Sequence, residues 1–410
     1  MTPADPRLDL RVLLDAAETA SPVDAVDVLA KELSTMLDAT AVSFLITNFS
    51  GDAVLRMSHV TGTSTKDDGH NERTESVTLS GSRYEEVLFR QELDVRRVAD
   101  GWQLLVPVTE RGDAIGILEL SLPHAPGEDE VSYVESAAHA LAFVLIASRR
   151  HTDLFEWAQR DTPFSLPAEI QRRLLPSAYT IEGGPFTVAG WLEPAANVGG
   201  DTFDYSVDRE YLYASLTDAM GHSTAAAVLA TLAVGSLRNT RRAIASPAEQ
   251  ASNANRVLLE SSSAEQFVTG LVLRIRLADG TGEIVNAGHP PPFLLRNGRA
   301  STVELPADPP LGIIDMQHSA HRIDLEPGDR LLLVTDGFLE RNAVHVDIPS
   351  TLEQSVERHP REIVRELASN VLSATEGNLR DDAAVLCIDW HGPGVTRNAV
   401  GGASRSRATD

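Results

Sequence analysis

The sequence predicts an α+β protein built from two domains, and three observations lead to this prediction. The chain has 410 residues, more than one hydrophobic core normally supports. In the first part of the chain a helical pattern precedes several strand-like runs. In the second part groups of strand-like runs lie between helical patterns. Hydrophobic residues make up 42% of the chain and charged residues 23%, which is ordinary for globular domains.

The first predicted domain spans residues 1–127. Apolar side chains recur at helical spacing over residues 23–37, which predicts an amphipathic helix. The strand-like runs that follow are separated by turn residues and lie at 41–47, 53–59, 103–109 and 114–121.

This arrangement resembles a GAF domain. The resemblance rests on the Leu-Val-Pro-Val run at 105–108 and the Gly-Ile-Leu-Glu-Leu run at 116–120, and it covers most of residues 20–150. It implies a sensory module that binds a small ligand or mediates dimerisation. His59, His70 and His139 are interpreted as surface or packing residues, because no ligand pocket is marked around them.

Residues 128–175 predict a helical linker. The stretch from 128 to 160 carries an apolar stripe with heptad-like spacing, which fits a homodimer seam and equally a helix packed on its own domain. Residues 168–175 predict a short amphipathic helix that Pro176 ends. The stripe consists of Val131, Val134, Ala138, Leu141, Leu145, Ser148, Leu154, Trp157 and Ala158.

Residues 176–391 form the second predicted domain, and the small, polar segment 392–410 is predicted to be disordered. A helix is expected over 223–240 with Ser223 as its N-cap, and a second helical region over 353–373. Strands are predicted at 187–192, 211–217, 270–277, 282–287, 292–296, 330–335 and 383–390.

Charge and cysteine content limit the classes of function. The net charge of −24 argues against a nucleic-acid partner, because a polyanion would be repelled. Cys387 is the only cysteine and lies in an apolar run, so we expect a buried thiol and a reducing compartment. The start of the chain shows no secretory signal, and the apolar stretch 137–147 is far shorter than the ~20 residues of a membrane helix. We therefore expect a cytoplasmic protein without a membrane-spanning segment.

Four aspartates carry the strongest functional signal: Asp201, Asp218, Asp336 and Asp381. Each lies at the edge of a strand-like segment, and three have a glycine within three residues, which lets the backbone approach closely. Carboxylates without thiolates among them favour Mg²⁺ or Mn²⁺. Two such ions roughly 3.5–4 Å apart activate a water for attack on a phosphate ester, so no protein nucleophile is needed.

The sequence blocks around these aspartates resemble the metal-dependent (PPM-type) protein serine/threonine phosphatases of the SpoIIE/RsbU branch. The resemblance covers about half of the chain and implies an α-β-β-α sandwich for residues 176–391. The matching blocks lie in order at 169–176, 198–204, 218–222, 267–269, 286–292, 309–312, 326–329, 335–340 and 381–382.

The resemblance also implies roles for individual residues. Asp201 and Asp218 would be the catalytic carboxylates shared by two Mn²⁺ or Mg²⁺ ions, and they would hold the attacking water. The main-chain carbonyl of Ala219 would be a further ligand, and Asp336 and Asp381 would complete the set.

Further residues of the blocks have weaker implied roles. Asp204, Gly337 and Asp382 are candidates for supporting the ligands, with Asp381 expected to face the metal in preference to Asp382. His222 and His289 are interpreted as structural hydrogen-bonding residues, and Asn286 and His289 are expected to brace the turn before three prolines. The chain departs from the family pattern at Ser223, at Ala384 and over 341–349.

The predicted function is removal of phosphate from serine or threonine of a partner protein. The resemblance suggests that this partner is an anti-anti-sigma factor in a partner-switching circuit that controls transcription. Two alternatives stay open: a signalling module with a vestigial metal site, and a phosphoesterase that acts on nucleotides. The nucleotide enzymes usually need histidines in the metal cluster.

Overall fold

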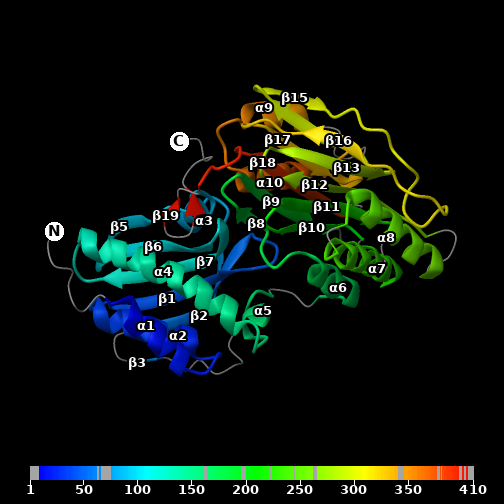
Figure 1. Ribbon diagram of the computed structural model, residues 1–410. Helices are drawn as coiled ribbons and strands as arrows, with labels where there is room; N and C mark the ends of the chain where they lie inside the picture. Colours follow the sequence, from blue (N-terminus) through cyan, green and yellow to red (C-terminus); the bar gives the residue numbers. More distant parts are fainter. Residues whose placement is uncertain are drawn as a thin grey trace. The chain divides into compact units, whose positions relative to one another are not determined.

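A computed structural model of the protein describes residues 9–61, 64–65, 75–160, 164–194, 200–221, 224–243, 245–261, 266–339, 346–375, 379, 381–396, 399–400 and 403–404. The chain divides into two compact units (Figure 1). Unit 1 comprises Met1–Pro163 and Asn398–Arg405, and unit 2 comprises Phe164–Arg397 and Ser406–Asp410.

Unit 1 is built on a seven-stranded sheet with the order β3-β2-β1-β7-β6-β5, and β4 pairs with β2. The predicted strands are all present, and the expected hairpin is formed by β6 and β7. The strands are β1 (Ala41–Thr47), β2 (Ala53–Thr61), β3 (Ser64–Thr65), β4 (Ser76–Thr78), β5 (Asp94–Val98), β6 (Gly101–Glu110) and β7 (Asp113–Leu122).

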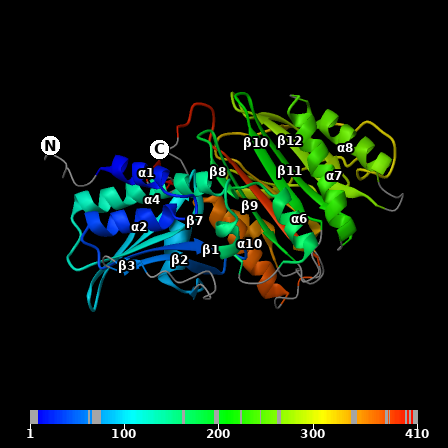
Figure 2. The same cartoon turned by 90° about the horizontal axis from the view of Figure 1, so that it is seen from below.

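Three helices pack on one face of this sheet, α1 (Leu10–Thr19), α2 (Ala25–Met36) and α4 (Glu128–Ser148) (Figure 2). The predicted helix over 23–37 is α2, whereas α1 was not predicted. A smaller apolar cluster on the other face includes side chains of α3 (Arg83–Arg90). The helices therefore cover both faces of the sheet and bury its apolar side chains.

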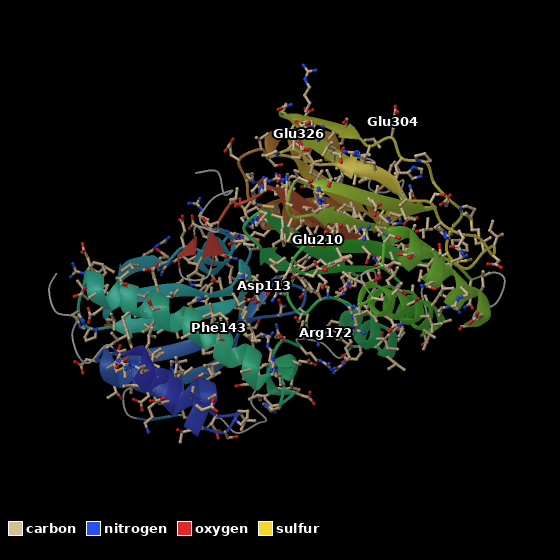
Figure 3. All side chains as sticks on the ribbon, in the orientation of Figure 1. Asp113, Phe143, Arg172, Glu210, Glu304 and Glu326 are labelled. Atoms are coloured by element: carbon tan, nitrogen blue, oxygen red, sulfur yellow. The ribbon has the colours of Figure 1, made fainter. Side chains whose placement is uncertain are left out.

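The predicted linker over 128–175 is divided between the two units. In unit 1 the helical region is interrupted after α4 and resumes as α5 (Leu154–Ala158), while α6 (Leu166–Leu174) belongs to unit 2. Most of the heptad-like stripe is buried in the unit 1 core, so the alternative of a helix packed on its own domain describes it. Phe143 lies on the other side of α4 and is 51% exposed (Figure 3).

Within the described residues, α4 is the one helix whose length and apolar composition would suffice to cross a membrane. Eight of its residues are buried, and its first turn carries three acidic residues. Packing in the unit 1 core accounts for this apolar composition.

Unit 2 contains two mainly antiparallel sheets, with the orders β10-β11-β12-β13-β16 and β15-β14-β17-β18-β9-β8. We call them the first and second sheet. The first sheet consists of β10 (Thr202–Val207), β11 (Tyr211–Ala219), β12 (Val268–Arg276), β13 (Thr281–Ala287) and β16 (His321–Asp324). The second consists of β8 (Thr180–Glu182), β9 (Phe186–Glu193), β14 (Phe293–Arg296), β15 (Arg299–Thr302), β17 (Arg330–Val334) and β18 (Ala383–Trp390).

Apolar clusters define the layers of unit 2. One cluster fills the space between the two sheets. A second joins the first sheet to α7 (Thr224–Arg241) and α8 (Pro247–Ser261), and a third joins the second sheet to α9 (Ile348–Gln354) and α10 (Pro360–Ala374). This is the helix-sheet-sheet-helix order of the predicted α-β-β-α sandwich.

Strand β18 lies at the centre of the second sheet, between β17 and β9, and all of its residues are buried. Cys387 lies on this strand opposite Leu332 and Ala189 and has no exposed surface, so the expected buried thiol is confirmed. Two further short elements complete the description: the 3-10 turn η1 (Asp336–Phe338) and the hairpin β19 (Ala399–Val400) with β20 (Ala403–Ser404).

Candidate metal centre

The first sheet brings Asp201 and Asp218 together. Strand β10 pairs antiparallel with β11 so that Thr202 lies opposite Thr217. Asp201, directly before β10, is therefore beside Asp218 near the end of β11. Glu210, which Figure 3 labels, lies at the turn at the other end of this strand pair.

The second sheet brings Asp336 and Asp381 together in the same way. Val334 pairs with Val385, and the amide of Thr335 donates to the carbonyl of Ala384 at 3.0 Å. Asp336 follows β17 and Asp381 precedes β18, so both lie at one edge of this sheet. The charge of Asp381 contributes to raising the pKa of Asp336, after the larger effect of partial burial.

The two pairs also face each other across the sandwich. Burial raises the pKa of Asp201 well above its usual range, and the charges of Asp218, Asp382 and Asp381 raise it further. Burial raises the pKa of Asp218 to about 7, with Asp336 and Asp381 from the other sheet as the next causes. Like charges held this closely repel each other, so the cluster is stable at neutral pH only with protons or cations bound.

Solvent exposure increases across the cluster. Asp201 is 2% exposed, and its Oδ2 atom has no hydrogen-bond partner among the described residues. Asp218 and Asp381 are half-buried and Asp336 is exposed. The cluster is thus open to solvent on the side of Asp336, while at its buried end a carboxylate oxygen lacks the partner that a cation would provide.

The donor set fits hard divalent cations. Carboxylates and one main-chain carbonyl are the ligands that Mg²⁺ and Mn²⁺ prefer. The carbonyl of Ala219 lies against Gly200, where an added Cβ would approach it to 2.6 Å. Within the described residues, no group of three or more histidine, cysteine, aspartate or glutamate side chains lies close enough together to hold a metal ion.

Gln171 on α6 belongs to this cluster and was not predicted as a site residue. It is 2% exposed, and its Nε2 donates to the main-chain carbonyl of Asp201 at 2.9 Å and to the carboxylate of Asp382. Asp382 is fully buried, and its carboxylate accepts a hydrogen bond from Gln171. The neighbouring Asp381 is partly exposed to solvent. The sequence signal was the position of Gln171 in the block at 169–176.

Asp204 forms its ion pairs with two arginines of α7. It is 4% exposed and accepts hydrogen bonds from Arg238 and Arg241 on α7, at distances from 2.8 to 3.1 Å. Arg238 also donates to the carbonyl of Leu174 at the end of α6. Asp204 therefore links β10 to α7 directly, and through Arg238 to the end of α6, a role that the sequence prediction did not include.

The turn around His289 follows its prediction. Asn286 donates from Nδ2 to the carbonyl of His289 at 3.0 Å and accepts from the His289 amide at 2.8 Å. Of the other expected features, Gly199, His222, Ser223 and residues 341–345 lie outside the described residues. Ala384 is buried in β18 and packs in the core between the sheets.

Comparison with known proteins finds similar sequences and structures. Residues 208–391 match the family model described as stage II sporulation protein E (SpoIIE). The phosphoserine phosphatase RsbU of Bacillus subtilis (strain 168) is 22% identical over 280 residues, which cover 63% of this chain and 81% of RsbU. The phosphoserine phosphatase RsbP of the same organism is 22% identical over 236 residues, covering 54% of this chain and 57% of RsbP.

A solved structure of RsbU and RsbW domains from Mycobacterium tuberculosis aligns with a TM-score of 0.46 and 22% identity, over 53% of this chain and 64% of that chain. The region matched by the family model contains Asp218, Asp336 and Asp381. Residues 208–391 match the SpoIIE family model, and over 63% of its length the chain is similar to the phosphoserine phosphatase RsbU; both findings support a SpoIIE/RsbU-like phosphatase of the metal-dependent PPM class.

Proposed function

We propose that the protein removes phosphate from serine or threonine of a partner protein with the help of Mn²⁺ or Mg²⁺. One observation carries this proposal: two aspartate pairs from two facing sheets meet at one open edge, with pKa values raised by burial and mutual repulsion. A surface cluster of acidic residues would be solvated and would not need this degree of burial.

We assign the ligand roles that the family resemblance implies. Asp201 and Asp218 would be shared by two ions, with the Ala219 carbonyl, Asp336 and Asp381 as the further ligands. Bound ions would supply Lewis acidity and a water of lowered pKa. The chain itself holds the ligands in place, because Gln171 binds both the main chain at Asp201 and the side chain of Asp382.

The relatives support a phosphoprotein as the substrate. RsbU and RsbP are phosphoserine phosphatases by name. We propose that this chain acts on the phosphorylated form of an anti-anti-sigma factor in a partner-switching pathway. The two alternatives to this proposal are a phosphoesterase that acts on nucleotides and a signalling module with a vestigial metal site.

We further propose that unit 1 is a GAF-like sensory domain of a cytoplasmic homodimer. In support, helices cover both faces of its sheet, and α4 leads from that sheet towards unit 2 along the chain. Its signal would change the activity of unit 2 through α5 and α6.

The test is phosphate release from candidate phosphorylated anti-anti-sigma factors, with and without Mn²⁺, beside a panel of cyclic nucleotides and dinucleotides. Metal-dependent release from a phosphoprotein supports the proposal. Turnover of nucleotides alone would replace it with the phosphoesterase, and the absence of Mn²⁺ binding by calorimetry would leave the vestigial site.

A further inference from the structure

His289 lies at the same edge of the sandwich as the aspartates, although it is not one of the proposed ligands. It follows β13, and Gly288 before it adopts φ +67°, which turns the chain there. The two main-chain groups of His289 are both bonded to the Asn286 side chain. These two hydrogen bonds fix the main chain of His289, and the residue is buried, with 4% of its surface exposed.

Both ring nitrogens have partners, and these partners lie on different sheets. Nε2 lies 3.2 Å from the carbonyl oxygen of Val334 on β17, and Nδ1 lies 2.9 Å from Thr269 Oγ1 on β12. A carbonyl only accepts, so Nε2 carries the proton, and Nδ1 of the neutral ring accepts from the Thr269 hydroxyl. Burial lowers the pKa of His289 to about 4, in keeping with a neutral ring.

One partner lies on the strand next to Asp218, and the other lies on the strand that leads to Asp336. Thr269 pairs directly with Asp218 in the register of β12 and β11. Val334 is the last residue of β17, two positions before Asp336. The imidazole of His289 therefore connects Thr269, the cross-strand neighbour of Asp218, to β17, the strand that leads to Asp336.

We propose that His289 is a positioning residue that sets the separation of Asp218 and Asp336 by joining β12 to β17. The inference deepens the proposed function and rests on it, because the separation matters only if both carboxylates bind the same metal centre. Ligands held by neighbouring hydrogen bonds bind metal more tightly, and losing such a bond typically costs 10–100-fold in affinity.

A purely structural histidine makes a different prediction. Replacing it would lower stability without a particular effect on metal affinity. The chain offers a matched control in His318, which is also 4% exposed, lies in unit 2 and bonds through Nε2 to the Pro309 carbonyl at 3.1 Å. His318 does not join the two aspartate pairs, since its amide donates to the Ser252 hydroxyl and its Nε2 bonds to the Pro309 carbonyl.

The experiment measures Mn²⁺ binding to the full chain by electron paramagnetic resonance, together with the melting temperature and turnover at saturating Mn²⁺. The variants are His289→Gln, His289→Asn and Thr269→Val, with His318→Gln as the control. Gln and Asn each replace one ring nitrogen, and Thr269→Val removes the hydroxyl while keeping the shape. We expect Mn²⁺ affinity to fall roughly 10–100-fold in the three site variants, with most turnover restored at saturating Mn²⁺.

His318→Gln should lower the melting temperature and leave Mn²⁺ affinity within about twofold of wild type. Wild-type Mn²⁺ affinity in Thr269→Val and in the folded His289 variants would overturn the inference alone. An equal loss in His318→Gln would overturn it too, because the effect would then follow from lost stability. If the wild-type protein binds no Mn²⁺, the proposed function fails first and the inference with it.

Discussion

Gly337 packs directly against the main-chain carbonyl of Asp382, with no room for a side chain between them: an added Cβ would lie well under 3.0 Å from that oxygen. This contact joins the turn that carries Asp336 to the segment that carries Asp381. The obstacle is a backbone atom, which cannot rotate away as a flexible side chain could.

Gly337→Ala should therefore displace one of the two aspartate segments. We expect at least a 10-fold loss of Mn²⁺ affinity and a matching loss of activity at limiting Mn²⁺, measured by calorimetry and phosphate release. Gly235→Ala is the matched control, because Gly235 lies within α7 and a Cβ there meets nothing within 4 Å. It should bind Mn²⁺ normally and gain about 0.5–1 kcal/mol of stability.

Asp218→Asn should abolish Mn²⁺-dependent phosphate release while the fold survives. The substitution keeps the size of the side chain but removes the charge, and Asp218 is the aspartate whose pKa the other sheet raises most directly. Turnover is expected to fall below detection, because the ions that would activate the water lose a shared ligand, and the circular dichroism spectrum should stay unchanged. Asp315→Asn, at an exposed position, is the control. Turnover like that of wild type in Asp218→Asn would refute the assignment of the site.

Gln171→Ala should weaken the site from the side of α6. The substitution removes the donor to the Asp201 carbonyl and leaves the buried carboxylate of Asp382 without this partner. We expect roughly a 10-fold or greater loss of Mn²⁺ affinity. Arg173→Ala on the same helix is the comparison, because Arg173 is largely exposed and pairs with Glu169. Equal behaviour of the two variants would show that Gln171 does not support the ligands.

Arg330→Met should destabilise unit 2 without touching the aspartate cluster. Arg330 and Asp389 are both fully buried and form a two-bonded ion pair at 2.6 and 2.8 Å. Removing one partner of such a pair costs about 3–5 kcal/mol of unfolding free energy, because the other charge stays buried. Adding Asp389→Leu should recover part of the loss in urea unfolding. Arg256→Met, which breaks an exposed pair with Glu260, should cost under about 1 kcal/mol.

His359 should make unit 2 less stable in mild acid. Burial lowers its pKa from 6.5 to about 4, Arg361 adds to this, and the bond from its Nε2 to Glu182 at 3.1 Å opposes it. Between these two pH values the unfolded chain binds more protons than the folded one, so unfolding free energy falls as pH falls, by up to about 3 kcal/mol. The measurement is the stability difference between wild type and His359→Gln at several pH values. A difference that stays constant from pH 7 to pH 4 would contradict the prediction.

The parts of the fold that depend on local pattern could be predicted from the sequence. Strand-like runs before Asp218 and Asp336 and after Asp381 predicted β11, β17 and β18, because buried strands carry dense apolar residues. The elements that were not predicted include α1, α8 and β10, whose sequences carry weaker periodicity or follow a glycine-rich block.

Contacts across long sequence separations could not be predicted. Gln171 and Asp382 are 211 positions apart, and nothing in either local sequence points to the other. Asp204 bonds to Arg238, 34 positions later in the chain. This link between β10 and α7 became visible only in the folded structure. The link from His289 to Asn286 spans only three positions and was predicted, whereas its link to Val334 spans 45 and was not.

The buried thiol on β18 offers a way to measure opening of the second sheet. Cys387 is the only cysteine of the chain, lies on the strand that follows Asp381 and Asp382, and has no exposed surface. An alkylating reagent can reach Cys387 only when the second sheet opens, so the rate of labelling depends on how often that sheet opens. Slower labelling with Mn²⁺ present would register occupancy of the aspartate cluster without any substrate, mutation or added dye.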